Sequence, residues 1–223
     1  MNPPSRNFDV LIFDLDGTLL DSLADIANAA NEVLQQHGHP PHALAAYRHL
    51  VGDGVRVLFE RALPSAYQQD SEMLDTCVAD FKTVYDRHWD RTSQPYAGIM
   101  ELLDELVTRQ LKLAVLSNKP HMFTTACVER FFGQTAWAKV LGNLPEVPRK
   151  PDPAGVHQIL SALDSEPTRC LYVGDTNTDM LTAKAAGCRA IGVTWGFRSA
   201  QELSDSGAAQ LIDHPHQLLE CLS

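Results

Sequence analysis

Two carboxylates, Asp14 and Asp16, follow the apolar run at residues 10–13 and are separated by one residue. A run so short and so apolar is typical of a strand buried on both faces of a parallel sheet. If Asp14 and Asp16 are the last residues of that strand, its period of two points both side chains to one side. Two close negative charges cost free energy unless a cation or a proton compensates them. The spacing therefore predicts a metal ion and a reaction at this strand end, where Gly17 permits a sharp turn.

Further polar residues gather where two other predicted strands end and before a predicted helix. They are Ser117, Asn118, Lys150, Asp175 and Asp179. Each group alone could be ordinary turn chemistry, because Ser, Asn, Asp and Gly are common in turns. In a parallel sheet, however, ligands bind beyond the carboxyl ends of the strands, where the strand order reverses. Several such groups at one edge of one sheet indicate a functional site.

These residue types suit the hydrolysis of a phosphate monoester. A phosphate dianion repels an anionic nucleophile, and a carboxylate nucleophile assisted by Mg²⁺ is one remedy. Asp14 could attack phosphorus while touching the metal, and Asp175 and the main-chain carbonyl of Asp16 could be the other protein ligands. The side chain of Asp16 would then act as general acid to the leaving oxygen and later as base towards water.

The remaining polar groups could hold the transferring phosphoryl group. Ser117 offers a hydroxyl, Asn118 a backbone N–H, Thr18 further donors and Lys150 a full positive charge. Fixed donors and cations aimed at developing charge are commonly the largest catalytic contribution. Asp179 either holds a metal-bound water, orients Lys150, or is an acidic residue favoured in a helix's first turn by the helix dipole.

The order of elements around these residues predicts an α/β fold with a doubly wound, mostly parallel sheet, a Rossmann-like core. Further strands are expected at 111–116, 139–141, 170–173, 189–193 and 210–212, and helices at 153–163, 178–186 and 215–221. Residues 19–92 show helical periodicity almost throughout. We therefore expect a core domain of residues 1–18 and 93–223, and a small α-helical cap domain of residues 19–92 inserted into it.

The candidate catalytic and binding residues also match a known pattern in their order and spacing. Asp14-x-Asp16-x-Thr18, Ser117, Lys150, and Gly174-Asp175 with Asp179 resemble the four motifs of the haloacid dehalogenase-like hydrolase superfamily. The resemblance covers nearly the whole chain, and it implies Mg²⁺ as cofactor. Thr176 stands where serine is frequent in the family, and either hydroxyl would serve. The presence of Asp16 argues against the dehalogenase branch, which lacks this second aspartate.

Within the superfamily the chain resembles the phosphoglycolate phosphatases, through residues 52–56, 116–120, 149–153 and 192–197. This implies a phosphoric monoester hydrolase that acts on a 2-phosphoglycolate-like substrate through an aspartyl phosphate. A sugar-phosphate phosphatase, a phosphomutase and a pyrophosphatase remain alternatives, as does a catalytically silent binding or regulatory module. Arg56 is either a contact for a substrate carboxylate or phosphate or a solvated arginine. Arg198 is a lesser candidate that we expect at the surface.

Composition excludes several other classes. The net charge of −10 argues against nonspecific binding to nucleic acid or to an anionic membrane. No apolar run approaches the ~20 residues of a membrane span, the amino terminus lacks a signal-peptide apolar region, and no GxGxxG follows the first strand. The five scattered cysteines and nine histidines show no metal-ligand or disulfide pattern. We expect a cytoplasmic monomer or homodimer whose partner is a small phosphorylated metabolite.

Overall fold

A six-stranded, wholly parallel sheet forms the centre of the computed structural model, which describes residues 7–222. Its order is β5–β4–β1–β6–β7–β8. The strands are β1 (Val10–Phe13), β4 (Lys112–Pro120), β5 (Trp137–Asn143), β6 (Cys170–Gly174), β7 (Arg189–Val193) and β8 (Gln210–Ile212). The order reverses at β1, which lies between β4 and β6. The predicted doubly wound α/β fold is therefore confirmed, and its ligand-binding edge is expected at β1.

Helices cover both faces of this sheet, which explains why β1 is apolar at every position. Leu11 and Phe13 pack on one face with residues of α5, α6 and η2, whereas Val10 and Ile12 pack on the other with α7, α8 and α9. These helices are α5 (Ile99–Thr108), α6 (His121–Phe132), α7 (Ala154–Ala162), α8 (Asn177–Ala186), α9 (Ala200–Asp205) and the 3₁₀-helix η2 (Pro215–Leu222); a short 3₁₀-helix, η1 (Pro167–Arg169), precedes β6. Alternate residues of one strand thus serve two apolar layers.

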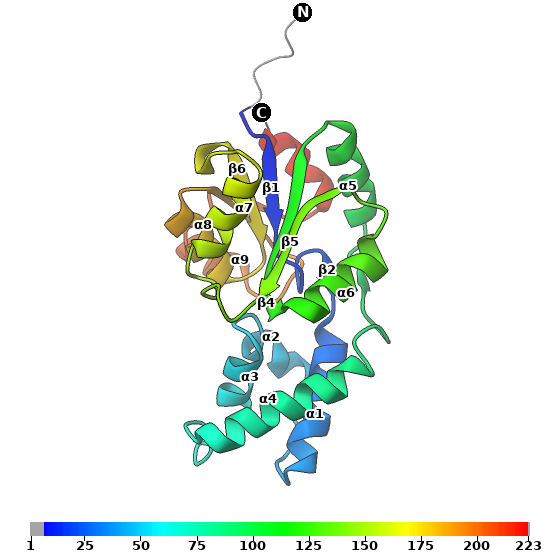
Figure 1. The fold of residues 1–223 in the computed structure, drawn as a ribbon, viewed down its shortest axis with the longest axis vertical. Helices are drawn as coiled ribbons and strands as arrows, with labels where there is room; N and C mark the ends of the chain where they lie inside the picture. The colour runs from blue at the N-terminus through cyan, green and yellow to red at the C-terminus, as the bar shows by residue number, and fades with distance from the viewer. Residues whose placement is uncertain (1–6, 223) are drawn as a thin grey trace, which may run out of the picture.

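A second group of helices lies beyond the carboxyl ends of β1 and β4 (Figure 1). It consists of α1 (Leu23–Gln36), α2 (Leu44–Leu50), α3 (Val55–Ala62) and α4 (Ser71–Asp86), and we call it the helical block. The block has its own apolar cluster, to which Phe123 of α6 and Phe197 also contribute. The helical periodicity of residues 19–92 is therefore largely reproduced, and the block lies over the expected edge of the sheet.

The two chain crossings between block and sheet are tied together. β2 (Leu20–Asp21) pairs antiparallel with β3 (Gln94–Pro95). Next to this pair, Asp25 of α1 accepts hydrogen bonds from the backbone N–H and hydroxyl groups of both Thr92 and Ser93, at 2.6 to 3.2 Å. A buried carboxylate with this many donors holds the entry and exit segments of the block side by side.

The ends of several elements differ from the sequence-based predictions. β1 ends at Phe13 rather than at Asp16, because the N–H groups of Thr18, Leu19 and Leu20 all turn back to the carbonyl of Leu15. β4 continues past the predicted end to Pro120, so that residues 117–119 belong to the strand. The last predicted helix is a 3₁₀-helix.

Two expectations concern the membrane and the amino terminus. Within residues 7–222, no helix combines the length and the hydropathy needed to cross a bilayer. The signal-peptide prediction depends mainly on residues 1–6, which lie outside the described part of the chain. The division into a core domain and a cap domain stays a prediction.

Candidate active site

Three buried carboxylates meet at the carboxyl edge of the sheet. One oxygen each of Asp14, Asp175 and Asp179 lies within 4.8 Å of the others, and we call these three residues the acidic cluster. Asp14 follows β1, Asp175 follows β6 and Asp179 lies in the first turn of α8. Lys150 reaches the cluster from the loop before α7, and its Nζ lies 2.9 Å from Asp14 Oδ1 and 2.7 Å from Asp179 Oδ1. The structure thus brings together four residues from three separate segments of the chain.

Asp175 is oriented by the turn that follows β1. Its Oδ1 accepts a hydrogen bond from the hydroxyl of Thr18 at 2.8 Å, and its Oδ2 accepts one from the N–H of Phe197 at 2.8 Å. A Cβ atom on Gly17 would lie 2.3 Å from Asp175 Oδ2, and the φ of Gly17 is +87°, so only glycine fits here. The Thr18 hydroxyl, which we predicted as a phosphate donor, donates to Asp175 in this arrangement.

Asp179 makes contacts that agree with two of its three predicted roles. Its Oδ2 accepts from the N–H and the hydroxyl of Thr176, at 3.0 and 2.7 Å, which completes a capping box at the start of α8. Its Oδ1 accepts from Lys150 and, at 3.3 Å, from the hydroxyl of Tyr172. Asp179 therefore both caps the helix and orients the lysine.

The electrostatics of the cluster favour a bound cation. Burial and the charges of Asp179 and Asp16 raise the pKa of Asp14 to about 7, because Lys150, which acts to lower this pKa, compensates them only in part. Burial and the neighbouring carboxylates also raise the pKa of Asp175 well above its usual value. Burial alone would lower the pKa of Lys150, but Asp14 and Asp179 outweigh it and raise that pKa well above the usual value. Three carboxylates facing one ammonium group leave excess negative charge.

The acidic cluster also has the donor chemistry that Mg²⁺ requires. Octahedral coordination at about 2.1 Å places oxygen ligands roughly 3 to 4 Å apart, and the cluster's oxygens lie within 4.8 Å of one another. Among residues 7–222, this is the one group of three or more His, Cys, Asp or Glu side chains with such spacing. Asp14 and Asp175 fit a divalent ion, with Asp179 beside them.

The end of β4 supplies the predicted phosphate-binding residues. The Ser117 hydroxyl oxygen accepts from the N–H of Lys119 at 3.3 Å, which leaves its own O–H able to donate. The Asn118 side chain donates to the carbonyls of Gly52 and Lys150, at 3.2 and 3.1 Å, and accepts from the N–H of Lys150 at 2.9 Å. Asn118 therefore connects β4, the lysine loop and the helical block.

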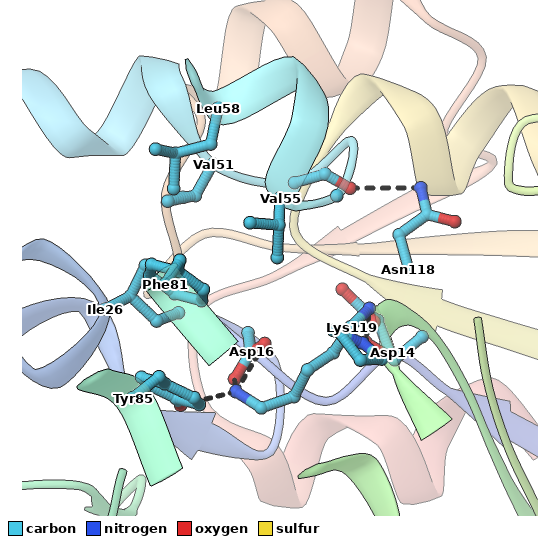
Figure 2. Close-up of a pocket in the computed structure, with 14 residues that line it drawn as sticks. Asp14, Asp16, Ile26, Val51, Val55, Leu58, Phe81, Tyr85, Asn118 and Lys119 are labelled. Carbon is cyan, nitrogen blue, oxygen red and sulfur yellow. Dashed lines mark hydrogen bonds and ion pairs between the residues drawn. The ribbon is translucent and has the colours of Figure 1, made fainter. Parts of the chain in front are cut away.

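A cavity of about 50 Å³ lies between the sheet edge and the helical block (Figure 2). Its polar wall comes from the sheet edge and its apolar wall from the block. The polar side is formed by Asp14, Asp16, Ser117, Asn118 and Lys119, and the apolar side by Ile26, Val51, Val55, Leu58, Phe81 and Tyr85. A small substrate could therefore reach Asp14 with its remaining part against apolar side chains.

The sequence analysis assigned no role to Lys119. Its Nζ lies 2.9 and 3.0 Å from the two carboxylate oxygens of Asp16 and 2.7 Å from the hydroxyl of Tyr85. Asp16 also accepts a hydrogen bond from Ser22 at 2.6 Å, so the carboxylate that we predicted to act as general acid and base is paired in this structure. The available signal was a lysine directly after Ser117 and Asn118 at the end of an apolar strand.

Arg56 and Arg198 lie in surroundings that differ from those we predicted. Arg56 forms an ion pair with Asp75 and lies 3.5 Å from Glu60, and it lines a separate cleft of about 470 Å³ rather than the cavity at Asp14. The prediction that Arg198 lies at the surface was wrong. Arg198 is buried and donates to the carbonyl of Val51 at 2.9 Å, because the loop before α3 packs over it.

The fold and the site together define an α/β enzyme whose reactive groups lie at the carboxyl edge of a parallel sheet. A model of the haloacid dehalogenase-like hydrolase family matches residues 11–193. The chain belongs to this family. This match confirms the predicted family, and the relatives named phosphoglycolate phosphatase confirm the predicted enzyme class, phosphoric monoester hydrolase.

Three similar proteins extend over nearly the whole chain. Phosphoglycolate phosphatase 1 of Pseudomonas aeruginosa is 31% identical over 95% of this chain and 79% of its own length. Phosphoglycolate phosphatase of Vibrio vulnificus is 32% identical over 96% of both chains. A solved structure from Lactobacillus delbrueckii subsp. bulgaricus has a TM-score of 0.89 and 30% identity, covering 97% of this chain and 98% of its own.

Proposed function

We propose that this chain is a Mg²⁺-dependent phosphatase that hydrolyses a small phosphate monoester through an aspartyl-phosphate intermediate. The observation that carries the proposal is the convergence of Asp14, Asp175 and Asp179 around Lys150 at the edge of the sheet. The substrate class is 2-phosphoglycolate-like. The names of the P. aeruginosa and V. vulnificus relatives support it, as does the small size of the cavity at Asp14.

In the first half of the reaction, an Asp14 carboxylate oxygen attacks phosphorus and the bond to the leaving oxygen breaks. Asp16 gives its proton to that oxygen, so the alcohol leaves uncharged and the phosphoryl group stays on Asp14. Asp14, Asp175 and the carbonyl of Asp16 would hold Mg²⁺, which offsets the charge between nucleophile and substrate. Lys150, 2.9 Å from Asp14, favours the ionised form of this carboxylate and holds it in place.

In the second half, water attacks the phosphorus of the aspartyl phosphate. Asp16, now ionised, takes a proton from that water, and the bond between phosphorus and Asp14 breaks. Inorganic phosphate leaves, and both aspartates return to their starting state. The ion pair of Asp16 with Lys119 suits this half, because it stabilises an ionised carboxylate at the cavity wall.

The remaining residues hold the phosphoryl group or the residues that bind it. Ser117 and the Asn118 backbone N–H donate to phosphoryl oxygens together with Lys150. Thr18 acts mainly by orienting Asp175, to which its hydroxyl donates. Asp179 orients Lys150 and could hold a metal-bound water beside Asp175.

We also propose that residues 19–92 act as a cap domain over a core of residues 1–18 and 93–223. The loop before α3 meets the core at several points, including Gly52 with Asn118 and Asp53 with Thr178. A cap that rests on the catalytic edge keeps bulk water from the nucleophile. The five cysteines are buried free thiols within this fold, which suits a reducing compartment such as the cytoplasm.

The proposal is tested with the purified chain, Mg²⁺ and a panel of phosphorylated metabolites ranked by kcat/KM. The panel contains 2-phosphoglycolate, sugar phosphates and pyrophosphate, and product analysis separates a phosphatase from a phosphomutase. We expect 2-phosphoglycolate to rank first and acid-quenched enzyme to carry phosphate on the peptide containing Asp14. Asp14→Asn should lower kcat/KM by at least about 10³-fold. Substantial turnover by Asp14→Asn would refute the nucleophile.

A further inference from the structure

Lys119 connects the carboxylate of Asp16 to helix α4 of the helical block. Figure 2 shows its side chain running along the cavity wall, with its Nζ between Asp16 and Tyr85. The pairing joins residues 103 positions apart on one side and 34 on the other. In the reaction proposed above, Lys119 transfers no proton, and its ion pair with Asp16 only stabilises the ionised carboxylate.

The Asp16 carboxylate is held by three donor contacts at short range. Lys119 contacts both of its oxygens, at 2.9 and 3.0 Å, and Ser22 donates to Oδ1 at 2.6 Å. The side chain of Lys119 is only 5% exposed and that of Asp16 only 16%. A charge so poorly hydrated is costly without a partner, so each residue strongly constrains the position of the other.

Lys119 is in turn fixed by Tyr85. The Tyr85 ring stacks on Phe81 at 5.2 Å between centroids and meets Phe123 edge-on at 5.1 Å. The Lys119 Nζ lies 4.7 Å from the centre of this ring and donates to its hydroxyl at 2.7 Å. A ring held between two others offers a rigid point of attachment.

We propose that Lys119, anchored on Tyr85, is a positioning residue that places the Asp16 carboxylate for proton transfer at the leaving oxygen. Through this contact, helix α4 determines where the general acid and base of the core lies. The proposal rests on the proposed function and adds no covalent step. Asp16 still gives one proton to the leaving oxygen and later takes one from water, while Lys119 keeps its own protons.

Two substrates with different leaving groups test this role. An alkyl phosphate such as 2-phosphoglycolate needs a proton on its leaving oxygen, whereas 4-nitrophenyl phosphate releases a stable anion. Because general acid catalysis contributes about 10²- to 10⁴-fold, Lys119→Met should lower kcat/KM for the alkyl phosphate by about 100-fold. It should lower kcat/KM for 4-nitrophenyl phosphate by less than about fivefold. The ratio kcat/KM is used because it reports the step in which the leaving group departs.

A double variant shows whether Lys119 acts through Asp16. Asp16→Asn removes the acid, so adding Lys119→Met to it should cause little further loss with the alkyl phosphate. Tyr85→Phe keeps the ring and removes only the hydroxyl. It should produce the same substrate selectivity with a smaller loss, about fivefold, and it guards against misfolding of the lysine variant. Tyr67→Phe, at an exposed tyrosine of the segment between α3 and α4, is the matched control.

Equal losses with both substrates in folded Lys119→Met and Tyr85→Phe proteins would overturn the proposal, since they indicate a merely structural role. Losses that multiply in the Asp16→Asn background would also overturn it. The proposed function fails differently. If Asp14→Asn retains activity on both substrates, the aspartyl-nucleophile reaction is wrong, whatever the selectivity of the Lys119 variants.

Discussion

Two buried carboxylates of this protein differ sharply in how well their surroundings stabilise the negative charge. Asp25 and Asp175 are 1% and 0% exposed, respectively. At Asp25 burial favours the neutral acid, but the hydrogen bonds from Thr92 and Ser93 outweigh it and lower the pKa. At Asp175 burial and the charges of Asp179 and Asp14 raise the pKa well above its usual value, and hydrogen bonds from Phe197 and Thr18 do not compensate.

Hydrogen bonds within the protein are enough to stabilise the charge of Asp25. The charge of Asp175 is not fully compensated by the protein's own groups. Asp25 joins the two segments that link block and sheet, and its hydrogen bonds suffice for that task. The acidic cluster carries charge that Lys150 alone does not balance. A buried group that is destabilised in the folded protein is typical of a functional site. We therefore expect variants at the two places to change different measurements.

The largest effect is expected at Asp175, whose charge the protein does not fully compensate. Asp175→Asn should lower kcat/KM by about 10³-fold, because it removes a proposed metal ligand. It should also abolish the rise in Tm that Mg²⁺ causes in the unchanged protein, about 2.7 kcal/mol of stabilisation at one hundred times Kd. Both are measured by kinetics and thermal melting with and without Mg²⁺. Asp104→Asn, at an exposed position of α5, is the control, and an unchanged Mg²⁺ response in Asp175→Asn would contradict the site.

At Asp25, whose charge is stabilised by hydrogen bonds, we expect a substitution to lower the stability of the fold. Asp25→Ala leaves the donors of Thr92 and Ser93 without their buried acceptor and should cost about 3 kcal/mol of unfolding free energy. The measurement is urea unfolding, with exposed Asp21→Ala as a control expected within about 0.5 kcal/mol. A loss no greater than that of the control would show that the Asp25 contacts contribute nothing.

Asp14 of the acidic cluster and Asp25 predict opposite dependences of stability on pH. The pKa of Asp14 is raised from 3.8 to about 7, so the folded, metal-free protein binds protons that the unfolded chain has lost. Its stability should therefore fall as pH rises from about 4 to about 7. The contribution of Asp25, whose pKa is lowered, is complete above its ordinary pKa and is lost on further acidification.

Mg²⁺ distinguishes the two contributions experimentally. Because the ion binds ionised carboxylates, it should remove the fall in stability between about pH 4 and about pH 7. The loss of stability on further acidification, which we attribute to Asp25, should stay unchanged. Urea unfolding across this range and below it, with chelator and with Mg²⁺, measures both changes in stability. A fall that persists in saturating Mg²⁺ would mean that it arises outside the acidic cluster.

The smallest effect concerns one hydrogen bond of Asp25. Thr92→Val removes the hydroxyl that donates at 2.6 Å but keeps the backbone N–H. Unfolding free energy should fall by about 1 kcal/mol, and the pKa of Asp25 should rise, which NMR titration of its carboxyl carbon can follow. If the pKa of Asp25 did not move, the hydroxyl would not be among the causes of its lowering.

The convergence of the candidate site could be predicted because it depends on strand ends. Parallel strands have their carboxyl ends at one edge, so Asp14, Ser117 and Asp175 meet once the alternation of strands and helices is recognised. The partners of Asp16, Arg56 and Arg198 could not be predicted in this way. Asp16 pairs with Lys119 of β4, which is itself bound to Tyr85 of the helical block. Arg56 pairs with Asp75 within the block, and Arg198 donates to Val51 in the loop before α3. The packing of the block determines these contacts.

By itself, the sequence determined the parallel α/β core, the helical character of residues 19–92 and the acidic residues at the edge, because local periodicity and strand-end position decide these features. The tertiary structure decided that β1 ends at Phe13 and that Lys119 forms an ion pair with Asp16. It also decided which buried carboxylate is fully hydrogen-bonded and which is not. Such outcomes depend on how close distant segments come, and free energies of burial and pairing change steeply with that distance.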